Sequence, residues 1–216
     1  MVRQGWAKAD QHAAFGYTGS FTAACWWKPA GVAANQGLIG KGGSNAGWGL
    51  RLLNGGLLYG FVGNGASLRT ATGATVLAVG TWYFVGIRWN ATTNAVDVWL
   101  YDRLEAQTGG GAFSVSAAGN NFRVAAAFNG AGSAEFAGGA FSAAWAVGAY
   151  LSDTQMRAAL ERGLWAALGS PASLWNGTFP VLDPRAGATN TLELRADHGT
   201  TAPTPRIMAD WRSRYA

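Results

Sequence analysis

The chain has 216 residues, of which 49% are hydrophobic and only 12% are charged, a composition that suits one large folded domain and excludes an intrinsically disordered chain. The net charge is +5, but the 16 Lys and Arg residues form no basic run, so we expect no nucleic-acid partner. The single cysteine, Cys25, excludes a disulfide framework and is expected to be a buried free thiol.

Short strands separated by Gly- and Asn-rich turns are predicted for the chain up to about Tyr150. Asn54-Gly55 lies between two apolar segments and is the residue pair that a type I′ hairpin turn prefers. The predicted strand regions are Phe21–Pro29, Gln36–Gly43, the hairpin Gly47–Gly65, the hairpin Gly80–Asp102, Asn120–Gly130 and Gly138–Leu151.

The hairpin Gly80–Asp102 has a register that can be predicted from its residues. The best register pairs Trp89 with Val96, Arg88 with Asp97, Ile87 with Val98, Gly86 with Trp99, Val85 with Leu100 and Phe84 with Tyr101. It places opposite charges opposite each other and covers a glycine with a ring, and both pairings stabilise antiparallel strands.

The two faces of this hairpin are predicted to have different roles, because successive strand residues point to opposite faces. Tyr83, Val85, Ile87 and Trp89 form the core face. The other face is rich in rings, which either stack on a sugar or are covered by the helix, the tail or another subunit; burial is favoured, since large aromatic residues normally bury most of their area. The candidate ligand- or partner-binding residues are Trp48, Trp82, Phe84, Trp99 and Tyr101.

A helix is predicted over residues 153–168. Ser152 is a natural N-cap and Gln155 completes a capping box. Gly169 suits the position after the last turn, and Pro171 prevents continuation. The apolar stripe recurs every four residues, at Met156, Leu160, Leu164 and Leu168.

The chain is therefore predicted to have two parts, a domain over residues 1–169 and a C-terminal extension over residues 170–216. The extension contains one predicted strand, Asn190–Ala196, followed by a Pro- and Thr-rich linker. We interpret it as a docking arm, because such tails often bind their own domain or a neighbour. Its candidate contact residues are Arg206, Trp211, Arg212 and Tyr215.

The Gly80–Asp102 segment resembles the hallmark hairpin of laminin-G-like, concanavalin A-like jelly rolls, with its Gly-Thr-Trp start, alternating apolar residues and short polar turn. Asn120–Leu160 resembles the later part of the same domain. The resemblance covers roughly residues 21–160 and implies an all-β sandwich of two antiparallel sheets, with a helix in the C-terminal half and an extended tail. Family members often carry an acidic residue in the strand before the helix, whereas the nearest one here is Glu135. A calcium site needs several hard oxygen ligands, and the 11 Asp and Glu residues form no dense cluster, so we expect no metal. No cofactor is expected either.

Catalysis is not expected. Glucanases of this superfamily use a Glu-x-Asp-x-Glu type of segment, which places two carboxylates on one strand face, and no such segment exists here. His12 and His198 are isolated in the sequence, and no nucleophile-elbow motif is found.

Two functions remain, and both are non-catalytic. The preferred one is a structural role as a bacteriophage virion accessory protein, such as a capsid decoration, fibre or tail protein, whose partners are other virion proteins or its own copies. The alternative is a carbohydrate-binding adhesion module that recognises host-surface glycans, and a glycan hydrolase is the least favoured. Because no secretory signal and no apolar stretch of about 18 residues is found, we expect production in a bacterial cytoplasm, location in the virion and no membrane insertion.

Overall fold

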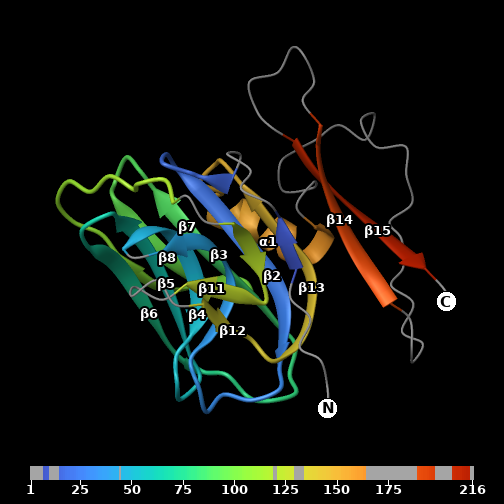
Figure 1. The fold of residues 1–216 in the computed structure, drawn as a ribbon. Helices are drawn as coiled ribbons and strands as arrows, with labels where there is room; N and C mark the ends of the chain where they lie inside the picture. The colour runs from blue at the N-terminus through green and yellow to red at the C-terminus, as the bar shows by residue number, and fades with distance from the viewer. Residues whose placement is uncertain are drawn as a thin grey trace. The chain divides into compact units, whose positions relative to one another are not determined.

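The computed structural model describes residues 7–9, 15–43, 45–118, 121–128, 134–163, 189–197 and 206–214. The chain divides into two compact units, Met1–Gly169 and Ser170–Ala216. The first unit contains β1 (Ala7–Ala9), β2 (Phe21–Pro29), β3 (Gln36–Gly43), β4 (Ala46–Leu52), β5 (Leu57–Asn64), β6 (Leu68–Val76), β7 (Tyr83–Asn90), β8 (Ala95–Leu100), β9 (Arg103–Thr108), β10 (Phe122–Val124), β11 (Ala126–Phe128), β12 (Ala134–Phe136), β13 (Gly139–Val147) and α1 (Asp153–Arg162) (Figure 1). The second contains β14 (Thr189–Asp197) and β15 (Arg206–Arg214).

The first unit is a sandwich of two antiparallel sheets. Sheet A has six strands in the order β1-β10-β3-β4-β5-β6, and sheet B has five in the order β13-β2-β7-β8-β9. A separate antiparallel pair, β11 and β12, lies across β3 and β4 (Figure 1). Together with α1 in the second half of the chain, this architecture confirms the predicted fold class.

The core lies between the inner faces of the two sheets. Val85, Ile87 and Trp89 are fully buried, as are their neighbours on β8, which confirms the predicted core face of the hairpin. A Cβ added at Gly60 of β5 would lie only 2.9 Å from Val98. A glycine at this position therefore lets the two sheets approach closely.

The predicted hairpin register is confirmed. β7 and β8 pair Trp89 with Val96, Arg88 with Asp97 and Gly86 with Trp99. The Tyr101 backbone N–H donates to the Phe84 carbonyl oxygen at 2.8 Å, one step beyond the end of β8. In the turn, the Asn90 side-chain oxygen accepts from two backbone N–H groups, and Asn94 takes a left-handed φ of 52°.

The hairpin at Asn54-Gly55 also forms, but its predicted type I′ turn is wrong. That turn needs positive φ at both central residues, whereas positive φ here falls on Gly55 (96°) and Gly56 (88°). The loop beside the turn explains the difference. The Asn54 N–H donates to the Asn35 side-chain oxygen, and the Gly55 N–H donates to the Val32 carbonyl oxygen.

Helix α1 begins as predicted but is shorter than predicted. Ser152 and Gln155 form the expected capping box. The helix ends at Arg162, because Gly163 has a φ of 83°, which a right-handed helix cannot contain. A continuous helix over residues 153–168 is therefore wrong, and the predicted stop at Gly169 lies outside the described residues.

Several strands were not predicted from the sequence. β6 and β9 are the edge strands of sheets A and B, so their sequences carry little alternation of apolar and polar residues. β15 occupies much of the region that was expected to be an extended tail, and it pairs with β14 along its whole length.

Candidate functional site

The ring-rich outer face of sheet B is covered by α1. Phe84 is 1% exposed and Trp99 is fully buried, and both pack in a cluster with Met156 and Ala159 of the helix and with Leu151 before it. These two rings therefore cannot stack on a ligand in this structure, which corrects their assignment as candidate site residues. Phe84 and Trp99 are instead covered by the helix, which was one of the alternatives for this face.

The assignment of Trp48 as a candidate binding residue is also wrong. It is 1% exposed and lies on the inner face of sheet A, where its ring centroid is 5.0 Å from that of Phe21. Its indole N–H donates to the Phe15 carbonyl oxygen at 3.1 Å. Trp48 is consequently a core residue with its polar atom satisfied.

Trp82 and Tyr101 remain accessible at one end of the face that α1 covers. Trp82 is 41% exposed, and the Tyr101 hydroxyl donates to the Trp82 carbonyl oxygen at 2.6 Å. Burial, and then the neighbouring Tyr83, raises the pKa of Tyr101. Two partly exposed rings that were not predicted, Trp26 and Trp145, flank Phe84 at centroid distances of 5.7 and 6.4 Å. Strand alternation from Phe21 could have placed Trp26 on this face.

The predicted Arg88–Asp97 pair is buried beneath α1, not exposed. The side chains are 1% and 0% exposed, and an Arg88 nitrogen lies 2.9 Å from the Asp97 carboxylate. Arg88 also donates to the Leu151 carbonyl oxygen and to Asp153, at the start of the helix. The guanidinium carbon lies 4.6 Å from the Trp99 ring centroid. The pair thus ties β7 and β8 to the first turn of α1.

The Asp97 carboxylate accepts two further hydrogen bonds. Gln107 donates to one carboxylate oxygen at 2.8 Å, and the Tyr150 hydroxyl donates to the other at 2.7 Å. Burial, followed by this hydrogen bond, raises the pKa of Tyr150 to about 12. The network therefore has the partners that a buried ion pair requires.

The outer face of sheet A presents a different arrangement. Arg51 on β4 lies directly opposite Tyr59 on β5, which lies opposite Thr72 on β6. We call these three residues the Arg51 row. They face away from sheet B, because Gly60, the neighbour of Tyr59, faces Val98 of sheet B. Tyr59 is partly exposed and Thr72 is exposed.

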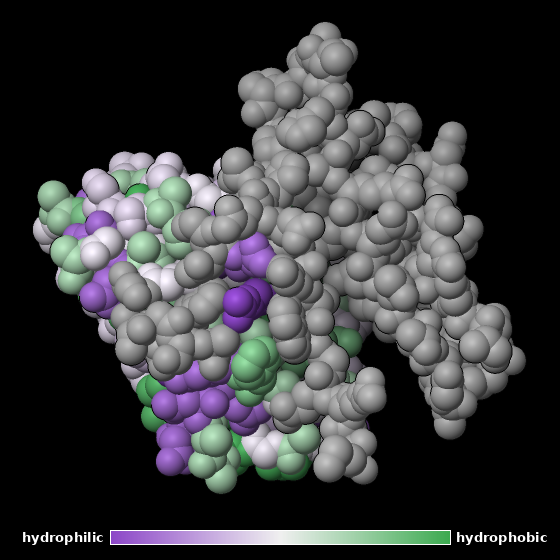
Figure 2. Space-filling model, viewed as in Figure 1, coloured by the Kyte–Doolittle hydropathy of each residue, from purple (hydrophilic) through white to green (hydrophobic). Residues whose placement is uncertain are grey.

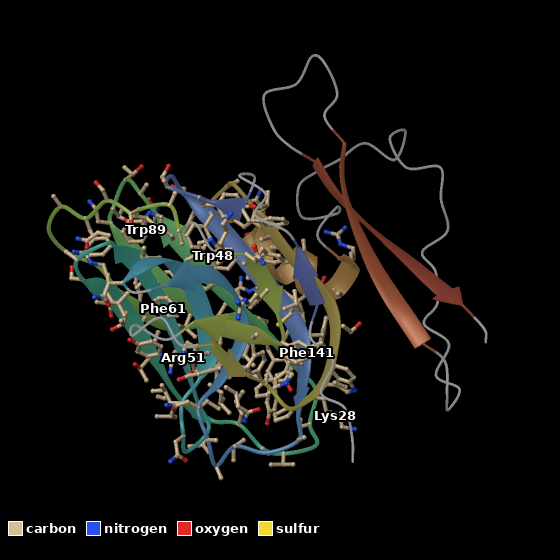
Figure 3. All side chains as sticks on the ribbon, in the orientation of Figure 1. Lys28, Trp48, Arg51, Phe61, Trp89 and Phe141 are labelled. Atoms are coloured by element: carbon tan, nitrogen blue, oxygen red, sulfur yellow. The ribbon has the colours of Figure 1, made fainter. Side chains whose placement is uncertain are left out.

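Arg51 is buried, at 7% exposed, and is held in place by two neighbours. Its nitrogens lie 2.7 and 2.5 Å from one carboxylate oxygen of Glu135 on β12. Its guanidinium carbon lies 5.5 Å from the Tyr59 ring centroid. In Figure 3, Arg51 and Phe61 lie on the side of the molecule that carries β4 and β5. Hydrophilic and hydrophobic residues lie side by side on the coloured part of this face in Figure 2.

Glycines under β11 and β12 bring Glu135 within reach of Arg51. A Cβ at Gly37 would lie 1.9 Å from the Ala127 nitrogen and 2.5 Å from the Glu135 carbonyl oxygen, and Cβ atoms at Gly40 and Gly49 would lie 3.5 Å from the Ala127 methyl group. The missing side chains on β3 and β4 therefore form a floor on which the β11–β12 pair rests. No local pattern points to this contact, because Arg51 and Glu135 are 84 residues apart.

Comparison with solved structures places this architecture among known folds. The CBM40 of Ruminococcus gnavus IT-sialidase superposes with a TM-score of 0.57 and 18% identity, covering 67% of this chain and 84% of that chain. The native heptameric SAP-like pentraxin from Limulus polyphemus gives 0.51 and 16%, covering 66% and 70%. Domains LG4-5 of the mouse laminin α1 chain give 0.51 and 17%, covering 66% and 38%.

The fold is a concanavalin A-like, laminin G-like jelly roll. At these identities the likeness establishes the fold, and function must be argued from the site. No protein-family model matches the chain, and no curated protein sequence matches it.

Three further observations concern a metal site, a membrane-spanning helix and the cysteine. Among the described residues, no group of three or more His, Cys, Asp or Glu residues is placed to hold a metal ion. Within the same ranges, α1 included, no helix has the length and apolar character needed to cross a bilayer. Cys25 is buried as predicted, and burial raises the pKa of its thiol to about 12.

The docking-arm residues belong to the second unit. Arg206, Trp211 and Arg212 are on β15, opposite Asp197, Leu192 and Thr191 of β14. Tyr215 lies outside the described residues. Their role as contact residues stays a prediction.

Proposed function

We propose that the jelly-roll unit is a non-catalytic carbohydrate-binding domain whose ligand lies on the outer face of sheet A. The observation that carries the proposal is the Arg51 row, in which a partly exposed ring lies between a fixed guanidinium and a hydroxyl. The fold is consistent with it, since a CBM40 bound to α2,3 sialyllactose superposes with a TM-score of 0.56 and 17% identity.

Tyr59 and Thr72 supply the contacts that a sugar needs, and the buried Arg51 supports them. The apolar C–H face of a pyranose ring stacks on Tyr59, because an aromatic face offers a flat apolar surface with little entropy to lose. Arg51 is 7% exposed and paired with Glu135, so its role is to hold the Tyr59 ring in position before the ligand arrives. The Thr72 hydroxyl both donates and accepts, so it can pair with a sugar hydroxyl in either sense.

The same face supports binding and argues against hydrolysis. Glycoside hydrolases place two carboxyl groups on either side of the scissile bond. The described strands of sheet A contain no Asp or Glu, and Glu135 of β12 is paired with Arg51. Among the described residues, the second carboxylate that a hydrolase needs is therefore missing from these strands.

A glycan array of neutral and acidic oligosaccharides tests the proposal, followed by calorimetric titration of the strongest binder. Tyr59→Ala should lower the affinity about tenfold or more, the size of effect seen for a central aromatic contact. Because Tyr59 is partly exposed, the melting temperature of the Tyr59→Ala variant should differ little from that of the wild-type chain. Trp82→Ala is the matched control, since Trp82 is an exposed ring just before β7 of the other sheet and its loss should leave binding unchanged.

The opposite pattern would locate the site elsewhere. If Trp82→Ala abolishes binding and Tyr59→Ala does not, the ligand lies beside α1 on sheet B. If no oligosaccharide binds the wild-type protein, the carbohydrate function itself is wrong.

The virion role stays a prediction that rests on composition and context. Its support is the bland surface expected of a chain with 32 glycines and few charges. Mass spectrometry of purified particles from a host that encodes this chain is the direct test, and its presence at stoichiometric amounts is the expected result.

A further inference from the structure

The outer face of sheet A carries very little charge around Tyr59. Gly49 of β4 shows which positions face outward, because a Cβ there would lie 2.6 Å from the Phe61 ring and 3.5 Å from the Ala127 methyl group of β11. The strand registers and alternation then assign the other outward positions. On β4, β5 and β6 these positions are Gly47, Gly49, Arg51, Tyr59, Phe61, Gly63, Leu68, Thr70 and Thr72. Arg51 is the one charged residue in this set.

The charge of Arg51 is balanced where it lies. Two of its nitrogens are 2.7 and 2.5 Å from one Glu135 oxygen, and the two side chains are 9% and 15% exposed. The guanidinium carbon is 5.5 Å from the Tyr59 ring centroid, about twice the separation within the ion pair. The opposite charges therefore largely cancel at the ring, and a ligand stacked on Tyr59 meets no net charge from this pair.

The arginines on two other strands of sheet A lie away from the ring. Arg69 of β6 has the opposite orientation to Thr70 and donates to the carbonyl oxygens of Asn94 and Gly110, beyond the sheet. Arg123 is on β10, which β3 and β4 separate from β5. The chain as a whole has a net charge of +5, but charges farther away than about 8 Å are largely screened at physiological salt. The balanced pair beside Tyr59 therefore sets the local charge.

We propose that the ligand of this face is a neutral glycan, one without carboxylate, sulfate or phosphate groups. This inference rests on the proposed carbohydrate-binding function and adds the class of sugar. An anionic group loses hydration when it binds, and only a cation or several donors can compensate for that loss. A neutral sugar needs an apolar ring surface and groups that both donate and accept, which Tyr59 and the Thr72 hydroxyl supply.

The first test uses the full wild-type chain and calorimetric titration. The probes are oligosaccharides in matched pairs, with and without a terminal sialic acid or sulfate ester, beginning with lactose and α2,3 sialyllactose. The neutral member of each pair should bind at least as tightly as the charged one. Its dissociation constant should change less than about twofold between about 0.05 and 0.5 M salt, because no charge on the ligand is screened.

Tighter binding of the charged members, with an affinity that falls as salt rises, would overturn the inference and leave the carbohydrate function standing. If the wild-type chain binds neither class, the proposed function itself fails. The two failures are therefore distinguishable in one set of titrations.

A variant that removes the balancing charge provides the second test. Glu135→Gln keeps the shape of the side chain and leaves the Arg51 charge uncancelled beside the ring. The ratio of affinities should then shift toward the charged member of each pair by about threefold or more, as expected for one additional net charge at this distance.

Glu161→Gln is the matched control for that variant. It makes the same chemical change at an exposed position of α1, on the other sheet, so the ratio should stay at the wild-type value. Equal shifts in the two variants would overturn the inference, because the net charge of the whole chain would then set the preference.

Thr72→Lys keeps the test available if Glu135→Gln does not fold. Thr72 is exposed, so the substitution should leave the fold intact, and it places an ammonium group on the strand position opposite Tyr59. This variant should also shift the ratio toward the charged members by about threefold or more. A ratio that Thr72→Lys leaves unchanged would show that the ligand does not lie on this row, and it would overturn the inference.

Discussion

The outer face of sheet B and the outer face of sheet A use their rings in different ways. On sheet B, Phe84 and Trp99 lie beneath α1, beside a buried ion pair. On sheet A, a short strand pair covers a floor of glycines, and Tyr59 stays partly exposed beside Arg51. The covered face of sheet B is thus part of the core, whereas sheet A presents an accessible ring beside a buried, paired arginine.

This difference predicts which measurement each face will affect. Substitutions under α1 should change the free energy of unfolding, because they leave a cavity or an unpaired charge in the interior. Substitutions of Tyr59 and Thr72 should change ligand affinity with little effect on folding, because these side chains are partly or fully exposed. The following predictions test that division, from the largest expected effect on stability to the smallest.

Arg88→Met should lower the free energy of unfolding by about 3–5 kcal/mol, because it leaves the buried Asp97 carboxylate without its cation. Urea denaturation measures the change. Arg103→Met is the matched control, since the Arg103 side chain is 61% exposed and its contact with Glu105 is expected to be worth less than about 1 kcal/mol. Equal losses in the two variants would show that the network beneath α1 is not a special feature of sheet B.

Gly37→Ala should displace β11 and β12 from sheet A, because the new methyl group overlaps backbone atoms of Ala127 and Glu135. We expect a loss of about 1–3 kcal/mol, as for other overpacked sites. Hydrogen exchange should become faster in β12, and glycan affinity should fall as Arg51 loses Glu135. Gly31→Ala is the control, since a Cβ there has nothing within 4 Å. Unchanged exchange in β12 would contradict the glycine floor.

Glu105 joins the edges of the two sheets and should make stability depend on pH. Its carboxylate accepts from the backbone N–H groups of Ala74 and Thr75 on β6. Burial raises the pKa of Glu105, but hydrogen bonds from Thr75 and Ala74 and the charge of Arg103 outweigh it, so the pKa lies below the ordinary value of 4.5. The stabilisation is therefore full above that value and is lost as the pH falls through the lowered pKa.

The wild-type chain and Glu105→Gln should differ in urea midpoint at neutral pH, and the difference should shrink as the pH falls below 4.5. A difference that stays constant down to the acid range would show that the carboxylate charge does not matter. This is the smallest of the three effects, because it concerns one carboxylate at the edge of the sandwich.

What could be predicted from the sequence was the part of the fold set by local pattern. The register of β7 and β8 follows from alternation and from Arg88 facing Asp97, nine residues away in the chain. The capping box of α1 is local for the same reason. The end of the helix was missed because the apolar stripe continues past Gly163, whose left-handed φ stops it.

The candidate site could not be predicted, because it depends on contacts between distant segments. Phe84 and Trp99 are hidden by a helix more than fifty residues later in the chain, so their burial has no local signal. The Arg51–Glu135 pair depends on where β12 lies, and β12 is three residues long and was not predicted. Strand alternation predicts that these rings share the outer face of sheet B, but it does not predict which segment covers that face.

The state of Cys25 has a practical consequence for all of these experiments. The thiolate is the reactive form of cysteine, and this fully buried thiol has a pKa of about 12. It is also the one cysteine in the chain. A cysteine introduced at the exposed position 72 would therefore take a maleimide dye at neutral pH while Cys25 stays unmodified. The chain can thus carry a single fluorescent reporter beside Tyr59, where the proposed sugar would change its signal.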